Sequence, residues 1–102
     1  MLNIPLQAVP NQSLSVLLDG NNYEIKIKSI GDELMAIDIV KNNVSLIEGQ
    51  RMVPSFFLIP YGYKGQDGNF SLITDNNEYP FYELFGISQS LLYFSPEDIA
   101  AL

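Results

Sequence analysis

Residues 14–27 read Leu14-Ser15-Val16-Leu17-Leu18-Asp19-Gly20-Asn21-Asn22-Tyr23-Glu24-Ile25-Lys26-Ile27. From Tyr23 to Ile27 the apolar residues alternate with charged ones, which is the two-residue period of a half-buried β-strand. A run rich in leucine and valine precedes that strand, and Asp19-Gly20-Asn21-Asn22 lies between the two. Residues of these types tolerate the positive φ angles of tight hairpin turns. The stretch therefore predicts a β-hairpin, and no catalytic motif accompanies it.

Length and composition indicate a folded, soluble protein. A chain of 102 residues predicts one domain, residues 1–102, with a single modest core. Its hydrophobic content of 47%, with 12% aromatic residues, argues against disorder. No apolar run approaches the ~20 residues that span a bilayer, and no secretory signal precedes the first strand. We therefore expect no membrane contact, and use in the compartment where the chain is made.

The residue types that are missing narrow the function. Cysteine and histidine are both absent, which excludes thiol catalysis, disulfides, Cys/His zinc sites and histidine general bases. We expect no cofactor and no enzymatic activity. Twelve acidic residues against five basic ones give a formal charge of −7, and the basic residues are scattered. Direct binding to nucleic acid is therefore not expected, because it needs clustered lysine and arginine.

The predicted fold class is mainly β: a single small β-barrel or β-sandwich of about six to eight antiparallel strands with a short C-terminal helix. The predicted strands are Leu14–Leu18, Tyr23–Ile30, Leu34–Val40, Val44–Glu48, Ser55–Ile59, Phe70–Thr74 and Leu91–Phe94, with a short edge strand around Leu2–Leu6. Pro5 confines this first strand to an edge or a strand start. Ser95 and Pro96 predict the start of the C-terminal helix, and one further turn of helix is expected at Tyr82–Phe85.

Three motifs suggest sites but favour structural interpretations. The glycine-rich loop from Tyr61 to Asn69 lacks the spacing and helix of a phosphate-binding loop, so Asp67-Gly68 is interpreted as a hairpin turn. Asp75-Asn76-Asn77-Glu78 gathers oxygen ligands, but without the spacing of a calcium loop it is interpreted as a turn. Asp38 lies between two isoleucines, and the strand alternation predicts that it faces outward.

The aromatic residues carry the clearest functional signal, because eleven of the twelve lie in the second half of the chain. Their first role is the core, but so many rings exceed what a small core encloses, and exposed rings are typical of protein interfaces. An edge strand can also pair with a partner chain through its backbone. The predicted interface residues are Leu2, Ile4, Leu6, Tyr61, Tyr63, Tyr79, Phe81, Tyr82 and Phe85.

Short matches along most of the chain resemble the small baseplate plug proteins of contractile-tailed bacteriophages. They are Ile4-Pro5-Leu6, Pro10-Asn11-Gln12, Val16–Gly20, Tyr23 and its strand, Ile37-Asp38-Ile39, Gly49 before the hydrophobic run to Leu58, Pro60 and Tyr61, Gly68-Asn69-Phe70, Ile73-Thr74-Asp75 and Leu91-Leu92-Tyr93. The likeness is weakest over Glu78–Gln89.

This resemblance implies a structural component of the tail baseplate, made in the host cytoplasm and carried in the virion. It would plug the distal tube or hub through contacts with hub, spike and tube proteins. A homo-oligomer is expected, and a trimer would suit a three-fold hub or spike. The alternative is a carbohydrate- or ligand-binding β-sandwich module, with a site built from Tyr61, Tyr63, Asp75 and Asn76.

Overall fold

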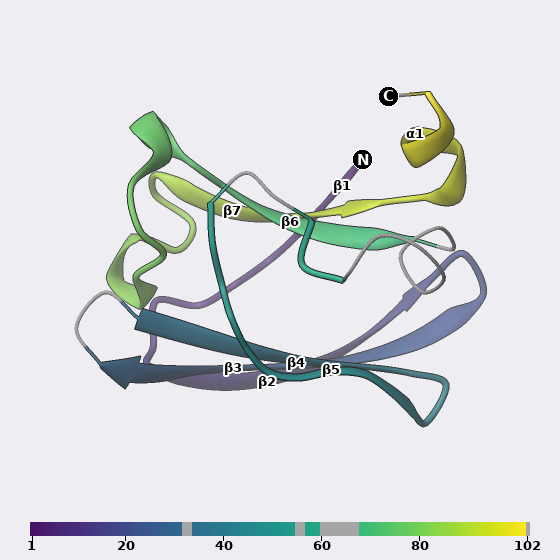
Figure 1. The fold of residues 1–102 in the computed structure, drawn as a ribbon, viewed down its shortest axis with the longest axis horizontal. Helices are drawn as coiled ribbons and strands as arrows, with labels where there is room; N and C mark the ends of the chain where they lie inside the picture. The colour runs from purple at the N-terminus through teal and green to yellow at the C-terminus, as the bar shows by residue number, and fades with distance from the viewer. Residues whose placement is uncertain (32–33, 55–56, 60–67, 102) are drawn as a thin grey trace.

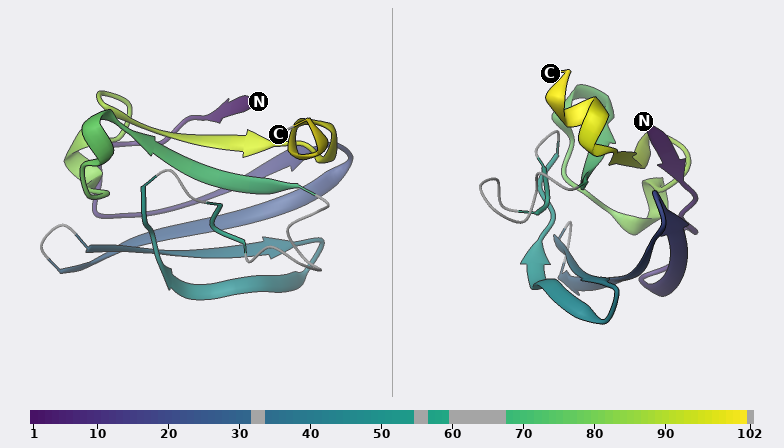
Figure 2. Two further views of the ribbon diagram at one scale, coloured as in Figure 1. Left: turned by 45° about the horizontal axis from the view of Figure 1, so that its top comes forward. Right: turned by 90° about the vertical axis from the view of Figure 1, so that its right-hand side faces the viewer.

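The computed structural model describes residues 1–31, 34–54, 57–59 and 68–101. Within these ranges the chain is mainly β and forms two antiparallel sheets that face each other (Figure 1). The four-stranded sheet has the order β2 (Asn11–Leu18), β3 (Asn21–Gly31), β4 (Leu34–Lys41) and β5 (Val44–Arg51). The three-stranded sheet has the order β1 (Leu2–Ile4), β7 (Gln89–Phe94) and β6 (Asn69–Thr74). Figure 2 shows the two layers from two further sides.

The predicted hairpin at residues 14–27 is confirmed, and it sets the register of the larger sheet. β2 pairs with β3 from Asn11↔Lys28 to Leu18↔Asn21 without a register shift. Only Asp19 and Gly20 form the turn, with φ angles of 50° and 77°. Two positive φ angles are the signature of the type I′ turn, whose twist matches that of the paired strands. Residues 42 and 43, both asparagine, close the β4–β5 hairpin in the same way, with φ angles of 50° and 66°.

The core lies between the two sheets and follows the predicted alternation. Tyr23, Ile25 and Ile27 of β3 are buried, while the residues between them are exposed. The facing strands β6 and β7 contribute Phe70 and Tyr93, which are fully or almost fully buried. Burying an aliphatic or aromatic side chain of this kind contributes roughly 1.5–3 kcal/mol, so this alternation stabilises the stacking of the sheets.

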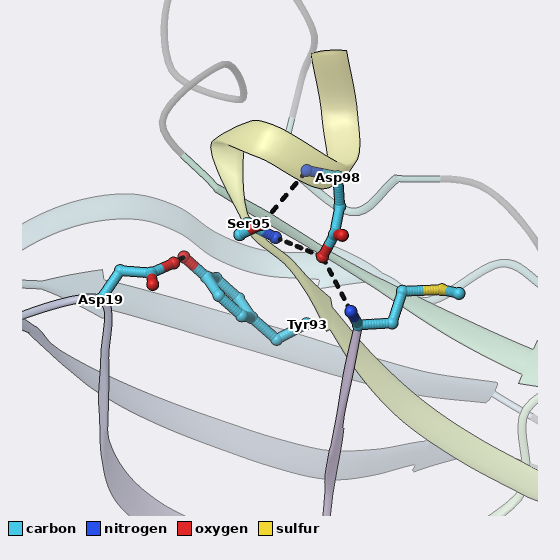
Figure 3. Close-up of polar contacts among 5 residues, drawn as sticks. Asp19, Tyr93, Ser95 and Asp98 are labelled. Atoms are coloured by element: carbon cyan, nitrogen blue, oxygen red, sulfur yellow. Dashed lines mark hydrogen bonds and ion pairs between the residues drawn. The ribbon is translucent and has the colours of Figure 1, made fainter. Parts of the chain in front are cut away.

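Three aromatic rings join the sheets at the centre of the core. The ring centroid of Tyr23 lies 5.3 Å from that of Phe70 and 5.8 Å from that of Tyr93, and the last two are 5.2 Å apart. The Tyr93 hydroxyl donates a 2.8 Å hydrogen bond to Oδ2 of Asp19 in the β2–β3 turn (Figure 3). Burial, followed by this hydrogen bond, raises the pKa of Tyr93 well above its usual value.

The short helix α1 (Pro96–Ala100) begins as the sequence predicts. The Ser95 hydroxyl accepts from the Asp98 amide at 3.1 Å, and the Asp98 carboxylate accepts from the Ser95 amide at 3.1 Å, which completes a capping box (Figure 3). The same carboxylate accepts a 2.8 Å hydrogen bond from the α-amino group of Met1. This amino group, and then the Ser95 amide, lowers the pKa of Asp98. In the described part of the chain, no helix has the length and apolar character needed to cross a membrane.

The structure corrects one predicted strand. Phe57, Leu58 and Ile59 do not form a strand, and the remainder of Ser55–Ile59 lies outside the described residues. A buried asparagine side chain replaces part of the ladder there, because Asn69 Oδ1 accepts from the Ile59 amide and its Nδ2 donates to the Ile59 carbonyl, both at 2.9 Å. The turn expected at Tyr82–Phe85 is a 3₁₀ turn, η3 (Tyr82–Leu84).

Candidate protein-interaction surface

The first predicted interface element, around Leu2–Leu6, is an edge as expected. β1 is the outer strand of its sheet and pairs with β7 through Leu2↔Tyr93 and Ile4↔Leu91. Leu2 remains 55% exposed, Ile4 is buried in the core, and Leu6 is half-buried against the core. Of these three residues, Leu2 therefore presents the largest apolar surface to a partner.

The second element is the aromatic segment from residue 79 to 85, which a buried glutamine holds in place. The Gln89 side chain accepts from the Phe81 amide at 2.9 Å and donates to the Tyr79 carbonyl at 2.8 Å. This glutamine is fully buried, so the two bonds satisfy backbone groups that water does not reach. Sequence reasoning assigned no role to Ser88-Gln89-Ser90, and only the non-local contact reveals it.

The four aromatic side chains of this segment divide by exposure. Tyr79 is 58% exposed, and the Arg51 guanidinium lies 5.8 Å from its ring centroid. Phe81 and Tyr82 are half-buried and form a tilted pair with centroids 4.8 Å apart. Phe85 is only 3% exposed, so the expectation that it is exposed is wrong. Its ring packs into the core cluster and so anchors the segment to the core.

Two predicted interface residues, Tyr61 and Tyr63, lie outside the described residues. The other half of the alternative sugar site, Asp75 and Asn76, is exposed in the 3₁₀ turn η2 (Asp75–Asn77). Within the described ranges, no group of three or more acidic side chains gathers in a way that could hold a metal ion.

A third element was not predicted as an interface: the outer edge of β2, which pairs with no other strand of the described residues and is called its free edge below. Leu14 and Val16 are half-buried and pack against the core from this edge, and Leu17 is 71% exposed. The sequence signal was present, because Asn11–Leu18 is an eight-residue run without charge or internal proline. Whether such a run is a central or an edge strand is decided by the pairing of the whole sheet, which the run itself does not specify.

The outer face of the four-stranded sheet is polar and shallowly hollowed. A groove of about 480 Å³ is lined by charged residues of three strands, among them Glu24, Lys26, Asp38 and Glu48. A second groove of about 460 Å³ continues beside β2 and includes Lys26 and Lys28. The side chains of both lysines are exposed.

Asp38 faces outward from β4 as predicted, and it also has a structural role. It lies where the β4–β5 register shifts between Ile37↔Gln50 and Ile39↔Ile47, which leaves an extra residue in β5. The Asp38 carboxylate accepts a hydrogen bond from the Gly49 amide in this bulge. Gly49 has a φ of 60°, which a residue with a side chain rarely adopts.

The comparison with protein families identifies the family of this chain. The family model described as "Cyanophage baseplate Pam3 plug gp18" matches residues 1–97. This chain belongs to that family. No curated protein matches the sequence.

Membership of a baseplate plug family gives the surfaces their context. It places the protein among the structural components of the phage tail baseplate, and hence in the virion. A component of this kind contacts other baseplate proteins. The exposed apolar residues on β1, on β2 and around Tyr79 are among the described surfaces to consider for those contacts.

Proposed function

We propose that this protein is a non-enzymatic plug that closes the distal end of the tail tube through protein–protein contacts with hub, spike or tube proteins. The observation that carries the proposal is the family match over residues 1–97. The composition supports it, because the chain has neither the cysteine nor the histidine on which many catalytic sites depend.

In this proposal the plug is held by its exposed apolar residues. Leu2 and Tyr79 form the centres of two contacts, and Leu6, Phe81 and Tyr82 flank them. Large side chains of this type contribute most when a partner excludes water from them. Ile4 and Phe85 act indirectly, because their burial fixes the backbone that presents Leu2 and Tyr79.

The proposed assembly is cyclic about the tail axis, with three copies to match a three-fold hub or spike. The net charge of −7 suits a surface that faces the DNA channel, because like charges repel phosphates and keep the DNA from adhering. We also propose that the fold is an open sandwich rather than a barrel. No two named strands from opposite sheets pair within the described residues.

The test compares tails assembled with three versions of the protein. Leu2→Asp with Tyr79→Asp places charge in both proposed contacts, and Val44→Asp is the matched control at an exposed site beside the β4–β5 turn. We expect the double variant to fold but to be missing from purified tails, which then lose their distal closure in electron micrographs. The control should be incorporated like the wild type.

Light scattering of the isolated protein, alone and mixed with the proteins encoded beside it, supplies the second measurement. A trimer, or a stable complex with hub, spike or tube protein, agrees with the proposal. A monomer that binds none of them, or tails that remain closed without the protein, would contradict it.

A further inference from the structure

We propose that β2 accepts an extended segment of another baseplate protein as an additional antiparallel or parallel strand, and that this segment carries acidic residues beside Lys26 and Lys28. The inference rests on the proposed function, since it names the class of partner that holds the plug. It concerns Asn11–Leu18, which sequence reasoning did not treat as an interface.

The outer edge of β2 carries backbone amides and carbonyls that can pair with a further strand. The Ser29 amide donates to the Pro10 carbonyl at 2.8 Å, so Pro10 is a residue whose backbone bonds β3. In an antiparallel pair, such residues alternate with residues whose backbone amide and carbonyl point away from the neighbouring strand. Even-numbered residues of β2 therefore bond β3. Amides and carbonyls of the odd-numbered residues, Asn11, Ser13, Ser15 and Leu17, point to the free edge.

The other edges lack these properties. β5 contains two register shifts as well as Glu48 and Arg51. β1 has three residues and is followed by Pro5. The outer side of β6 meets residues 54 and 57 through isolated bridges. Charge, proline, bulges and short length are the devices that prevent edge pairing, and β2 has none of them between Asn11 and Leu18.

Charge at the Asn11–Ser13 end of β2 favours an acidic partner strand there, whereas Glu24 lies opposite Ser15 further along. Lys26 lies opposite Ser13 and Lys28 opposite Asn11, so both lysines share the outer face with these small side chains. An added strand would lie about 4.8 Å beyond β2. The long lysine side chains can extend across Ser13 and Asn11 towards it. Neither lysine forms an ion pair with any residue in the described ranges.

The side chains of β2 also specify the pattern of the partner. On the inner face, Leu14 and Val16 would be covered by apolar residues of the added strand. On the outer face, acidic residues would face the lysine end, and an apolar residue would face Leu17. A second copy of this chain is less suitable, because β2 pairing with itself provides no carboxylates for the lysines.

Amide hydrogen exchange of the protein in purified baseplates, compared with the isolated protein, tests the inference. The amides of Ser13, Ser15 and Leu17 should exchange rapidly in the isolated protein and at least about tenfold more slowly in the baseplate. Those of Leu14 and Val16 should be protected in both, because they bond β3.

Two pairs of variants sharpen the result. Ser15→Pro removes an edge-facing amide without removing a β2–β3 bond and should lower incorporation about fivefold, whereas Ser15→Ala should not. Lys26→Glu with Lys28→Glu should lower it about tenfold at low salt and less at high salt, whereas Lys26→Arg with Lys28→Arg should not. The lysine pair is exposed, so this test does not depend on the folding of Ser15→Pro. Urea unfolding of the charge-reversed pair shows whether the new charge opposite Asp38 lowers stability, and a loss of incorporation at unchanged stability supports the inference.

The outcomes separate this inference from the proposed function. If the protein is incorporated and the odd-numbered amides still exchange freely, the strand-addition proposal is wrong and the plug proposal stands. If density beside β2 belongs to a second copy of the chain, the proposed class of partner is wrong. If the protein is absent from baseplates, the plug proposal itself fails.

Discussion

The hydroxyl of Tyr93, on β7, donates a 2.8 Å hydrogen bond to the carboxylate of Asp19, which lies 74 residues away in the β2–β3 turn. It links the last strand of one sheet to the first turn of the other. Tyr93→Phe keeps the ring and removes the bond, so we expect a loss of about 1–2 kcal/mol in the free energy of unfolding, measured with urea. Tyr79→Phe, at an exposed site, is the control and should leave stability unchanged.

The same tyrosine predicts a dependence on alkaline pH. Burial raises the pKa of Tyr93 in the folded state above the value of about 10 expected in the unfolded chain. Its contribution to stability is therefore complete below pH 10 and is lost as pH rises towards the folded-state pKa. Stability measured between pH 8 and pH 11 should decline less steeply for Tyr93→Phe than for the wild type. Equal slopes would refute this assignment.

Gly68 lies against the same tyrosine. A Cβ atom there would be 2.7 Å from the Tyr93 hydroxyl oxygen and 3.0 Å from that of Tyr23, and the φ of Gly68 is 123°. Gly68→Ala should therefore cost about 2–3 kcal/mol in thermal or urea unfolding. Gly20→Ala is the matched comparison, because its φ is also positive but no atom lies within 4 Å of the added Cβ. It should cost about 1 kcal/mol, and equal losses at both sites would count against the clash.

Gln89 supports the aromatic segment through two buried bonds. Gln89→Ala leaves the Phe81 amide and the Tyr79 carbonyl without this partner, which should cost about 2–3 kcal/mol in urea unfolding. Hydrogen exchange should accelerate from residue 79 to 85 in particular. A uniform change across both sheets would instead indicate general destabilisation. Ser90→Ala, at the exposed neighbouring position, serves as the control.

Asp38 stabilises the β5 bulge through the Gly49 amide. Asp38→Ala should cost about 1–2 kcal/mol in urea unfolding, and Asp38→Asn should recover part of it because an acceptor remains. Glu48→Ala tests whether any nearby carboxylate would suffice, and it should have little effect. Losses of equal size for Asp38→Ala and Glu48→Ala would contradict the assigned role.

The lowered pKa of Asp98 predicts that the stability of α1 depends on acidic pH. The α-amino group of Met1, and then the Ser95 amide, lowers the folded-state pKa of this carboxylate. Its contribution to the stability of α1 is therefore present at neutral pH. It is lost as pH falls from about 4 through the lowered pKa. Nuclear magnetic resonance should show α1 fraying below pH 4, and Asp98→Asn should fray at neutral pH too. Ser95→Ala should weaken the same helix by about 1 kcal/mol.

Local chemistry accounts for the parts of the structure that the sequence predicted correctly. Asp19-Gly20 specified the hairpin turn, alternation from Tyr23 to Ile27 specified the buried face, and Ser95-Pro96 specified the helix start. The parts that were missed depend on distant partners. The side chains of Asn69 and Gln89 bond backbone of other segments, and neither motif nor periodicity indicates such bonds.

The residues of the candidate surface also divide into those that local sequence predicted and those that depend on distant partners. The edge at Leu2 was predictable because a strand that runs into proline is restricted to an edge. The burial of Phe85 and the free edge of β2 were not, because exposure is decided by how the sheets stack. An aromatic residue in the sequence indicates a large apolar side chain, but it does not indicate whether that side chain faces the core or the solvent.

The pairing of β1 with β7 has a consequence for how the protein is made. Residues 11–51 contain the complete four-stranded meander, so this sheet can form on the ribosome soon after its last strand emerges. The three-stranded sheet joins Leu2 to Tyr93, and it cannot close until β7 has been synthesised. Until then the inner face of the meander, including Ile25 and Ile37, lacks its cover. From the formation of the meander until β7 emerges, the growing chain therefore exposes this apolar face, and we expect chaperones to be most needed in that interval.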